Sequence, residues 1–536
     1  MRWIDRQGRY FKPDGGRDFE EAPHGTSSPT GAGVRKLANI TSFGLLALLT
    51  VAMPSAAVAQ ITEDGLLHEA VGAPDNWHLS GSVRARFEAI DGQFREDAVN
   101  RNQVLALRTT LFAEYDAGPV RFGAEFHDAR AYFQRRGSSV GTDVVNALEF
   151  SQYYAQGDLG EAPGSGSTSY LKAGRMTMQL GSERLVARQG FRTSVTSFTG
   201  LRLTREGEDD RAFVAFWTMP TVRLPTGTTA IRRNRPQWDR ENTDLQLFGA
   251  FNRLPLGGEI RLETYVYGLI ERGESQADRS DRRLVTPGAR LFVRPDQGMT
   301  FEVEAMAQYG RGRDGSPDSG KPVVPVAAYG FHGDVGYRFA GGWKFELTAF
   351  FDYYTGNRRE DRIGRFDTLY GARRFEFGPT ELFGAADRSN MLSPGVRLKA
   401  APTGGLSVMG DYRLLRLASA VDRFSNSDVR DATGRAGRNA GQQVQLQVEY
   451  DLVADILALD LGYARLFKGR FLREAPNAPD PRDVQLRLRV DHVLLLAASI
   501  WLHGQVALFL PPLIRRRDTG LRNLTPPSTS PVYAGK

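Results

Sequence analysis

The chain has 536 residues, of which 41% are hydrophobic and 24% charged, and it contains no cysteine. Disulfide scaffolds, thiol catalysis and cysteine-ligated metal sites are therefore excluded. Its 69 basic residues comprise 8 Lys and 61 Arg, yet 62 acidic residues leave a net charge of only +7. Because the acids are intermixed with the arginines, the basic stripe of a nucleic-acid-binding protein is not expected.

The N-terminal region predicts export. Arg35 and Lys36 precede a short apolar run at 43–53, and an Ala-Val-Ala sequence ends at Ala59. Positive charge, a short apolar segment and small residues at a cleavage site are typical of a secretory signal peptide. About 11 apolar residues are too few to span a bilayer as a helix. We interpret residues 1–59 as a signal peptide with an extra N-terminal segment at 1–33 that results from a misassigned start, and residues 60–78 as a periplasmic segment.

Beyond this point apolar and polar residues alternate. In the segment 79–90, Val83 and Phe87 fall on one face, and Arg84 and Arg86 fall on the other. The same period of two recurs at 120–128, 299–309, 343–354 and 445–450. A period of two with one apolar face predicts β-strands that bury one side.

The segments between these strands alternate in length. Short turns lie at 116–119, 253–258, 295–298, 340–342, 402–405 and 451–455. Long polar stretches lie at 91–103, 129–146, 272–283, 310–326, 355–390, 418–440 and 468–483. Short turns on one side and long loops on the other are the plan of an outer-membrane β-barrel.

Breaks in the pattern divide the chain into eighteen candidate strands. They begin near Leu79, Val104, Val120, Ala147, Tyr170, Phe198, Arg211, Thr243, Glu259, Leu284, Met299, Ala327, Trp343, Met391, Leu406, Gly441, Ile456 and Val484. An even number returns both ends of the barrel to the periplasmic side. The predicted fold is all-β, a single transmembrane antiparallel barrel of about 18 strands over 79–495.

Two soluble all-β architectures are alternatives. A β-sandwich does not account for strict short and long alternation over so many strands without a domain break. A propeller requires a recurring motif at a period of roughly 40–50 residues, and the sequence contains none. The membrane barrel is therefore the favoured fold.

Three blocks of residues carry recognisable motifs. The first block is Leu171-Lys172-Ala173-Gly174-Arg175 with Gly181-Ser182-Glu183-Arg184-Leu185-Val186 and Phe198-Thr199-Gly200-Leu201-Arg202-Leu203. The second is Tyr354-Thr355-Gly356-Asn357 with Phe366, Tyr370-Gly371, Asp387, Asn390 and Pro394-Gly395-Val396. The third is Leu461-Gly462-Tyr463-Ala464 with Gly469, Phe471 and Leu472. In content and order these blocks resemble the alginate export family of outer-membrane β-barrels. The resemblance implies an 18-stranded barrel whose lumen passes an anionic polysaccharide through an Arg-lined constriction. The count of eighteen strands therefore depends on the resemblance as well as on the breaks.

The C-terminal region departs from that pattern. The resemblance stops near Pro481, and the segment 484–490 still alternates. A nearly uncharged run at 493–514 then leads to three arginines and a polar tail. We expect 496–536 to be an atypical tail that arose by a frameshift, which translation of the coding DNA past Asp483 in the other two frames would test.

Arginines on the face opposite the apolar stripe are the candidate solute-binding residues. They comprise Arg84, Arg86, Arg108 and Arg121 on predicted strands, and Arg184, Arg188, Arg192 and Arg202 in the first motif block. A guanidinium group suits a passing carboxylate because its planar fork makes bidentate hydrogen bonds and stays charged. The acids between them leave a second interpretation open, in which the arginines form cross-strand pairs. The segment 181–197 is expected to fold inward and form the constriction.

Aromatic residues near strand ends are predicted to form interfacial girdles. They are Tyr115, Trp343, Tyr353, Tyr354, Tyr450 and Tyr463.

The sequence contains no metalloprotease, nucleophile-elbow or P-loop motif, so no catalytic residue, metal site or cofactor is predicted. The function expected is a channel in the cell outer membrane for an alginate-like anionic polysaccharide. An anion-selective porin for the uptake of small organic anions is the first alternative, and a structural or lipid-acting barrel is the second. The expected partners are the solute, outer-membrane lipid and periplasmic export components, and no nucleic acid.

Overall fold

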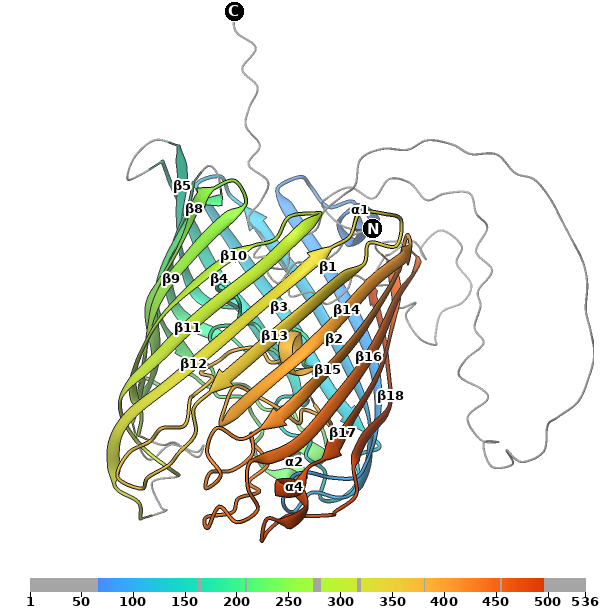
Figure 1. Ribbon diagram of the computed structural model, residues 1–536. Helices are drawn as coiled ribbons and strands as arrows, with labels where there is room; N and C mark the ends of the chain where they lie inside the picture. The colour runs from blue at the N-terminus through green and yellow to red at the C-terminus, as the bar shows by residue number, and fades with distance from the viewer. Residues whose placement is uncertain are drawn as a thin grey trace, which may run out of the picture.

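The structure is a computed structural model that describes residues 66–495, except 162–165, 208–209, 273–280, 316–319, 380 and 454–455. The predicted signal peptide and the predicted tail at 496–536 lie outside the described residues. Within them, eighteen strands form one antiparallel sheet that closes on itself (Figure 1).

The strands are β1 (Trp77–Asp91), β2 (Arg101–Asp116), β3 (Val120–Tyr132), β4 (Asn146–Gly160), β5 (Ser167–Met176), β6 (Phe198–Gly207), β7 (Ala212–Pro220), β8 (Leu245–Gly257), β9 (Ile260–Glu271), β10 (Arg283–Val293), β11 (Gly298–Arg313), β12 (Val323–Arg338), β13 (Glu346–Tyr354), β14 (Met391–Thr403), β15 (Leu406–Arg416), β16 (Asn439–Val453), β17 (Leu457–Lys468) and β18 (Val484–Leu495). Short helices are α1 (Leu66–Val71), α2 (Thr228–Arg232), α3 (Arg374–Phe377) and α4 (Arg470–Glu474).

The barrel closes because β1 pairs with β2 on one side and with β18 on the other. Every other strand pairs with its neighbours in sequence. The predicted fold is confirmed, and each strand begins within four residues of its predicted start. Short turns gather at the end of the barrel where α1 lies, and long loops at the end with α2 and α4 (Figure 1).

The two faces of the sheet differ in polarity, as the alternation predicted. Leu111 and Phe122 point away from the lumen and are exposed, whereas Arg108 and Glu125 point inward and are buried. An apolar outer band with a polar interior is the arrangement of a barrel surrounded by lipid. Separately, none of the helices among the described residues has the length and apolar character needed to cross a membrane.

The predicted aromatic girdle is correct in part. Trp343 and Tyr450 are exposed near the short-turn end of the barrel. The prediction for Tyr354 is wrong, because its side chain is fully buried. Its ring packs inside the barrel against Phe366 at 5.3 Å and Phe377 at 6.3 Å, centroid to centroid.

Two long connections fold into the lumen. We call the β5–β6 connection at 177–197 the first inner loop and the β13–β14 connection at 355–390 the second inner loop. Val186 and Tyr370 form a parallel bridge between them. The Tyr370 amide donates to the Leu185 carbonyl at 2.9 Å, and the Ala372 amide donates to the Glu183 carbonyl at 2.9 Å. The inward fold expected for 181–197 is therefore present.

Candidate functional site: the lumen and its inner loops

Eight arginines are the largest fully buried polar side chains of the described residues, each at most 1% exposed. They are Arg84, Arg86, Arg108, Arg184, Arg290, Arg388, Arg413 and Arg489. A guanidinium group removed from water needs acceptors, because an unpaired buried charge is costly. Their partners therefore determine how the lumen is organised.

The wall made by β1 and β2 holds residues 190 and 191 of the first inner loop. Arg84 and Arg108 both donate to the carbonyl oxygen of Gly190, at 3.3 and 2.7 Å. Arg86 donates to the carbonyl oxygen of Phe191 at 2.8 Å and lies 4.1 Å from the centre of its ring. Three of the candidate solute-binding arginines therefore contact the loop backbone.

Arg184 anchors an earlier part of the same loop. Its guanidinium group lies 2.7 Å from a carboxylate oxygen of Glu302 and 2.5 Å from one of Glu376, and it also pairs with Glu304. Burial alone would lower the pKa of Arg184, but these three carboxylates raise it well above its usual value. The cation links the first inner loop to β11 and to the second inner loop.

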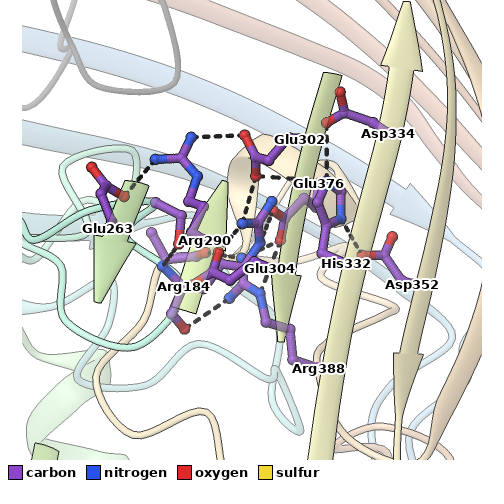
Figure 2. A network of polar contacts seen from close by, with 12 residues as sticks. Arg184, Glu263, Arg290, Glu302, Glu304, His332, Asp334, Asp352, Glu376 and Arg388 are labelled. Atoms are coloured by element: carbon purple, nitrogen blue, oxygen red, sulfur yellow. Dashed lines mark hydrogen bonds and ion pairs between the residues drawn. The ribbon is translucent and has the colours of Figure 1, made fainter. Parts of the chain in front are cut away.

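The ion pairs around Arg184 form a continuous network (Figure 2). Arg290 on β10 bridges Glu263 on β9, at 2.8 Å, and Glu302 on β11, at 2.7 Å. Arg388 of the second inner loop donates to Glu376 at 2.9 Å. The network therefore runs from the barrel wall into both inner loops.

The same network contains a group of side chains that could hold a metal ion. Ligand atoms of Glu302, His332 and Asp334 lie within 4.8 Å of one another. However, Arg294 donates to Glu302 at 3.0 Å and to Asp334 at 2.8 Å, and His332 also contacts Asp352 at 2.7 Å. Because the carboxylates already bind cationic groups, the arrangement is an ion-pair network.

Arg188 fastens the middle of the first inner loop to β3. Its guanidinium group lies 2.7 Å from a carboxylate oxygen of Glu125, which also accepts from Gln152 at 3.1 Å. Within the loop, the Thr196 amide donates to the Arg188 carbonyl at 2.8 Å. The loop is thus attached to the wall at three places along its length.

Two other candidate arginines lie away from this loop. Arg202 faces the lumen on β6, five residues beyond the end of the first inner loop toward the short-turn end, and is in register with Lys172 on β5. Arg121 is half-buried at the start of β3 and lies 3.6 Å from Asp116. These residues place further positive charge on the lumen wall.

A different group of arginines projects from four long loops and is only half-buried. We call it the loop arginine cluster, and it consists of Arg95, Arg192, Arg223 and Arg373. Sequence analysis identified Arg192 and missed the other three. Loops have no alternation to mark an inward-facing position, although Arg373 lies within the second motif block.

Contacts with the inner loops bring the cluster together. Arg95 donates to the carbonyl oxygens of Leu382 at 2.9 Å and Phe383 at 3.2 Å, both in the second inner loop. Arg223 donates to the carbonyl oxygen of Val195 in the first inner loop at 3.5 Å. The two inner loops therefore carry or contact all four arginines.

Two aspartates neighbour the cluster. Asp387 lies 3.5 Å from the Arg373 guanidinium group. The carbonyl oxygen of Asp143, in the β3–β4 loop, accepts from the Ser194 amide at 3.0 Å. Glu381 also attracts Arg192, and Glu88 attracts Arg95. Glu381 is shared with Arg86, which lies 3.1 Å from it.

The titration of two of these side chains reflects their burial and their mutual repulsion. The pKa of Arg373 is lowered to about 10, mainly by burial and then by repulsion from Arg192, while the negative charge of Asp387 opposes this shift. Burial, and then repulsion from Arg373, lowers the pKa of Arg95 to about 10. Both stay charged near neutral pH, and an anion placed between them would relieve their repulsion.

Known proteins resemble this chain both in sequence and in structure. The sequence model of a family described as "Alginate export" matches residues 76–484. A search of curated proteins gives no match. Among solved structures, OccK8 (OprE) of Pseudomonas aeruginosa is similar at 14% identity over 79% of this chain and 98% of that chain, with a TM-score of 0.51. OccK11 (OpdR) of the same organism is similar at 13% identity over 78% and 96%, with a TM-score of 0.50. At these identities the likeness shows the barrel fold.

Proposed function

Because the chain belongs to the alginate export family, we propose that its barrel passes an anionic polysaccharide of the alginate type. The protein is a porin-like channel of the outer membrane, and its family and fold are those of transport channels. In such barrels the short turns face the periplasm and the long loops face outward.

The loop arginine cluster is the observation that carries this proposal. Four arginines from four loops belong to or contact the two inner loops inside the lumen, and each lies close enough to repel the next. Planar guanidinium groups suit a chain of carboxylates, because each can form two parallel hydrogen bonds and none can lose its proton at neutral pH. Sites that share several half-buried cations bind an anion moderately and can release it, as transport requires.

The eight arginines predicted to bind solute then take three roles in the proposal. Arg192 contacts the passing anion directly, and Arg121 and Arg202 supply positive charge on the wall nearer the periplasm. The others position the inner loops that present the cluster; these are Arg84, Arg86, Arg108, Arg184 and Arg188.

Single-channel recording of the purified barrel in a planar bilayer tests the proposal. Under a salt gradient we expect a reversal potential that indicates anion selectivity, and we expect an oligouronate to block the current. A neutral oligosaccharide of equal length should block far less. Cation selectivity, or the absence of conductance, would contradict the proposal. Block by small organic anions with no effect of the oligouronate would favour an anion porin instead.

Matched variants connect the result to the cluster. Arg192→Gln with Arg373→Gln should reduce both selectivity and oligouronate block. Arg359→Gln, an exposed residue of the second inner loop, serves as the control. Asp387→Asn should act in the opposite direction, because it removes negative charge next to Arg373.

A further inference from the structure

The outer surface of the barrel carries a row of polar residues at the long-loop ends of four adjacent strands. Arg465 on β17 pairs in register with Gln485 on β18, which pairs with Asp91 on β1, which pairs with Arg101 on β2. Alternation along each strand directs these side chains outward, because their neighbours Ala464 and Leu486 are buried on the lumen side. The row therefore faces the surroundings of the barrel and not its lumen.

Further arginines extend the row. Arg487 of β18 pairs with Asp91, as does Arg101 at 3.0 Å. Beyond the strand ends, in the β17–β18 loop, Arg473 lies 3.4 Å from Asp483. We call the whole group the rim cluster; it comprises Arg101, Arg465, Arg473, Arg482 and Arg487 with Asp91, Asp480 and Asp483.

The arginines of the rim cluster are more exposed than its aspartates. The five arginine side chains are 40–60% exposed, whereas the three aspartates are 12–22% exposed. The aspartates thus lie beneath the arginines and hold them in place, and the surface presented outward is mainly positive. Five cations over three anions also leave a net positive charge.

The rim cluster surrounds a cleft. An opening of about 390 Å³ is lined by Asp91, Arg465, Arg473, Pro481, Arg482, Asp483 and Gln485. Three guanidinium groups around one cleft can bind the oxygens of a phosphate group from several sides. On the side of the row toward the short-turn end, Leu461 and Leu488 are exposed on the same outer surface and belong to the apolar band.

We propose that the rim cluster binds the phosphorylated headgroup of the lipopolysaccharide in the outer leaflet. A ligand at this position needs an anionic head at the level of the row and an apolar body along the band beneath it. A phosphorylated glycolipid has both parts, and basic pockets at the membrane surface are suited to such headgroups. The site lies outside the lumen, so it serves attachment to the membrane and not passage of solute.

Binding of lipid A to the purified full-length barrel in a non-ionic detergent tests the proposal, with native mass spectrometry as the readout. The barrel should bind bisphosphorylated lipid A, and dephosphorylated lipid A should bind more weakly by on the order of tenfold. Arg465→Gln with Arg473→Gln should weaken the binding of bisphosphorylated lipid A by a similar factor. The binding should also weaken as ionic strength increases.

The opposite wall supplies a matched control. Arg283 and Arg311 are exposed, outward-facing and paired in register at the long-loop end of β10 and β11. Arg283→Gln with Arg311→Gln removes the same charge and should leave lipid A binding unchanged. Heat-modifiable mobility on gels confirms that each variant has folded.

Three outcomes would overturn the proposal. Equal losses in the two double variants would show a non-specific attraction of lipid to the rim. Equal binding of dephosphorylated lipid A would show that the phosphates are not recognised. Displacement of lipid A by inorganic phosphate alone at millimolar concentration would show a site for free phosphate.

Discussion

The amide nitrogen of Tyr370 lies 2.9 Å from the carbonyl oxygen of Leu185, and this hydrogen bond joins two loops that leave opposite walls of the barrel. Each loop leaves many backbone groups without strand partners, and such groups need hydrogen bonds when they are buried. Pairing of the loops meets that need. The two inner loops therefore act as one unit inside the lumen.

Gly371→Ala should separate the inner loops. A Cβ atom on Gly371 would collide with the carbonyl oxygen of Arg184, a backbone atom that cannot rotate away. Forcing an extra methyl group into a packed site costs about 1–3 kcal/mol. We expect a larger and noisier single-channel current and faster proteolysis of the loops. Gly404→Ala, in a turn with open space around the new Cβ, is the control, and equal currents for the two variants would show that the crossing does not limit the pore.

Arg184→Gln should lower the free energy of unfolding, because it leaves three buried carboxylates with less positive charge. Removal of one partner from a buried ion pair costs about 3–5 kcal/mol. Denaturant titration of the barrel measures the loss. Adding Glu304→Gln should recover part of it, since Glu304 pairs with Arg184. Strictly additive effects of the two changes would contradict the coupling.

Packing of the β7–β8 loop at 221–244 should depend on pH. Burial, and then repulsion from Glu149, raises the pKa of Asp239 to about 7. A raised carboxyl pKa favours the packed, protonated form, so this contribution to stability is complete below about pH 4 and is lost as pH rises through about 7. Asp239 accepts from the Leu224 amide and from Asn146, each at 2.9 Å, which fixes the loop to β4.

Hydrogen exchange of the segment 221–244, corrected for intrinsic rates, should therefore show less protection at pH 8 than at pH 6. Asp239→Asn should remove the difference, because the amide stays neutral at both values. Identical protection of the unmodified protein at both pH values would refute the role of Asp239.

Arg202→Glu should weaken anion selectivity without unfolding the barrel. The change reverses a charge on the lumen wall next to Lys172. We expect the reversal potential to move toward that of a non-selective pore, and the effect to diminish at high salt, where the Debye length is only about 3 Å at 1 M. Arg205→Glu, near the short-turn end of the same strand, is the comparison. An unchanged reversal potential would give Arg202 a structural role only.

Much of the fold could be predicted because strand alternation is a local property. Residues such as Phe87 and Arg86 face opposite sides of the sheet whatever the rest of the chain does, so the pattern located the strands and separated the lipid face from the lumen. Tyr354 shows the limit of such reasoning. Its position near a strand end predicted an interfacial residue, but only the second inner loop provides the rings that bury it.

The sequence by itself determined that arginines and acids share the inner face of a closed barrel. It left open whether Arg84 and Arg184 meet a solute or other groups of the protein, and the tertiary structure pairs the first with a loop carbonyl and the second with three carboxylates. It also assembled Arg95 and Arg373 into one cluster from loops without a period. The physical reason is that a strand's orientation follows from neighbouring residues, whereas the partner of a buried charge depends on distant segments that meet only when the barrel closes.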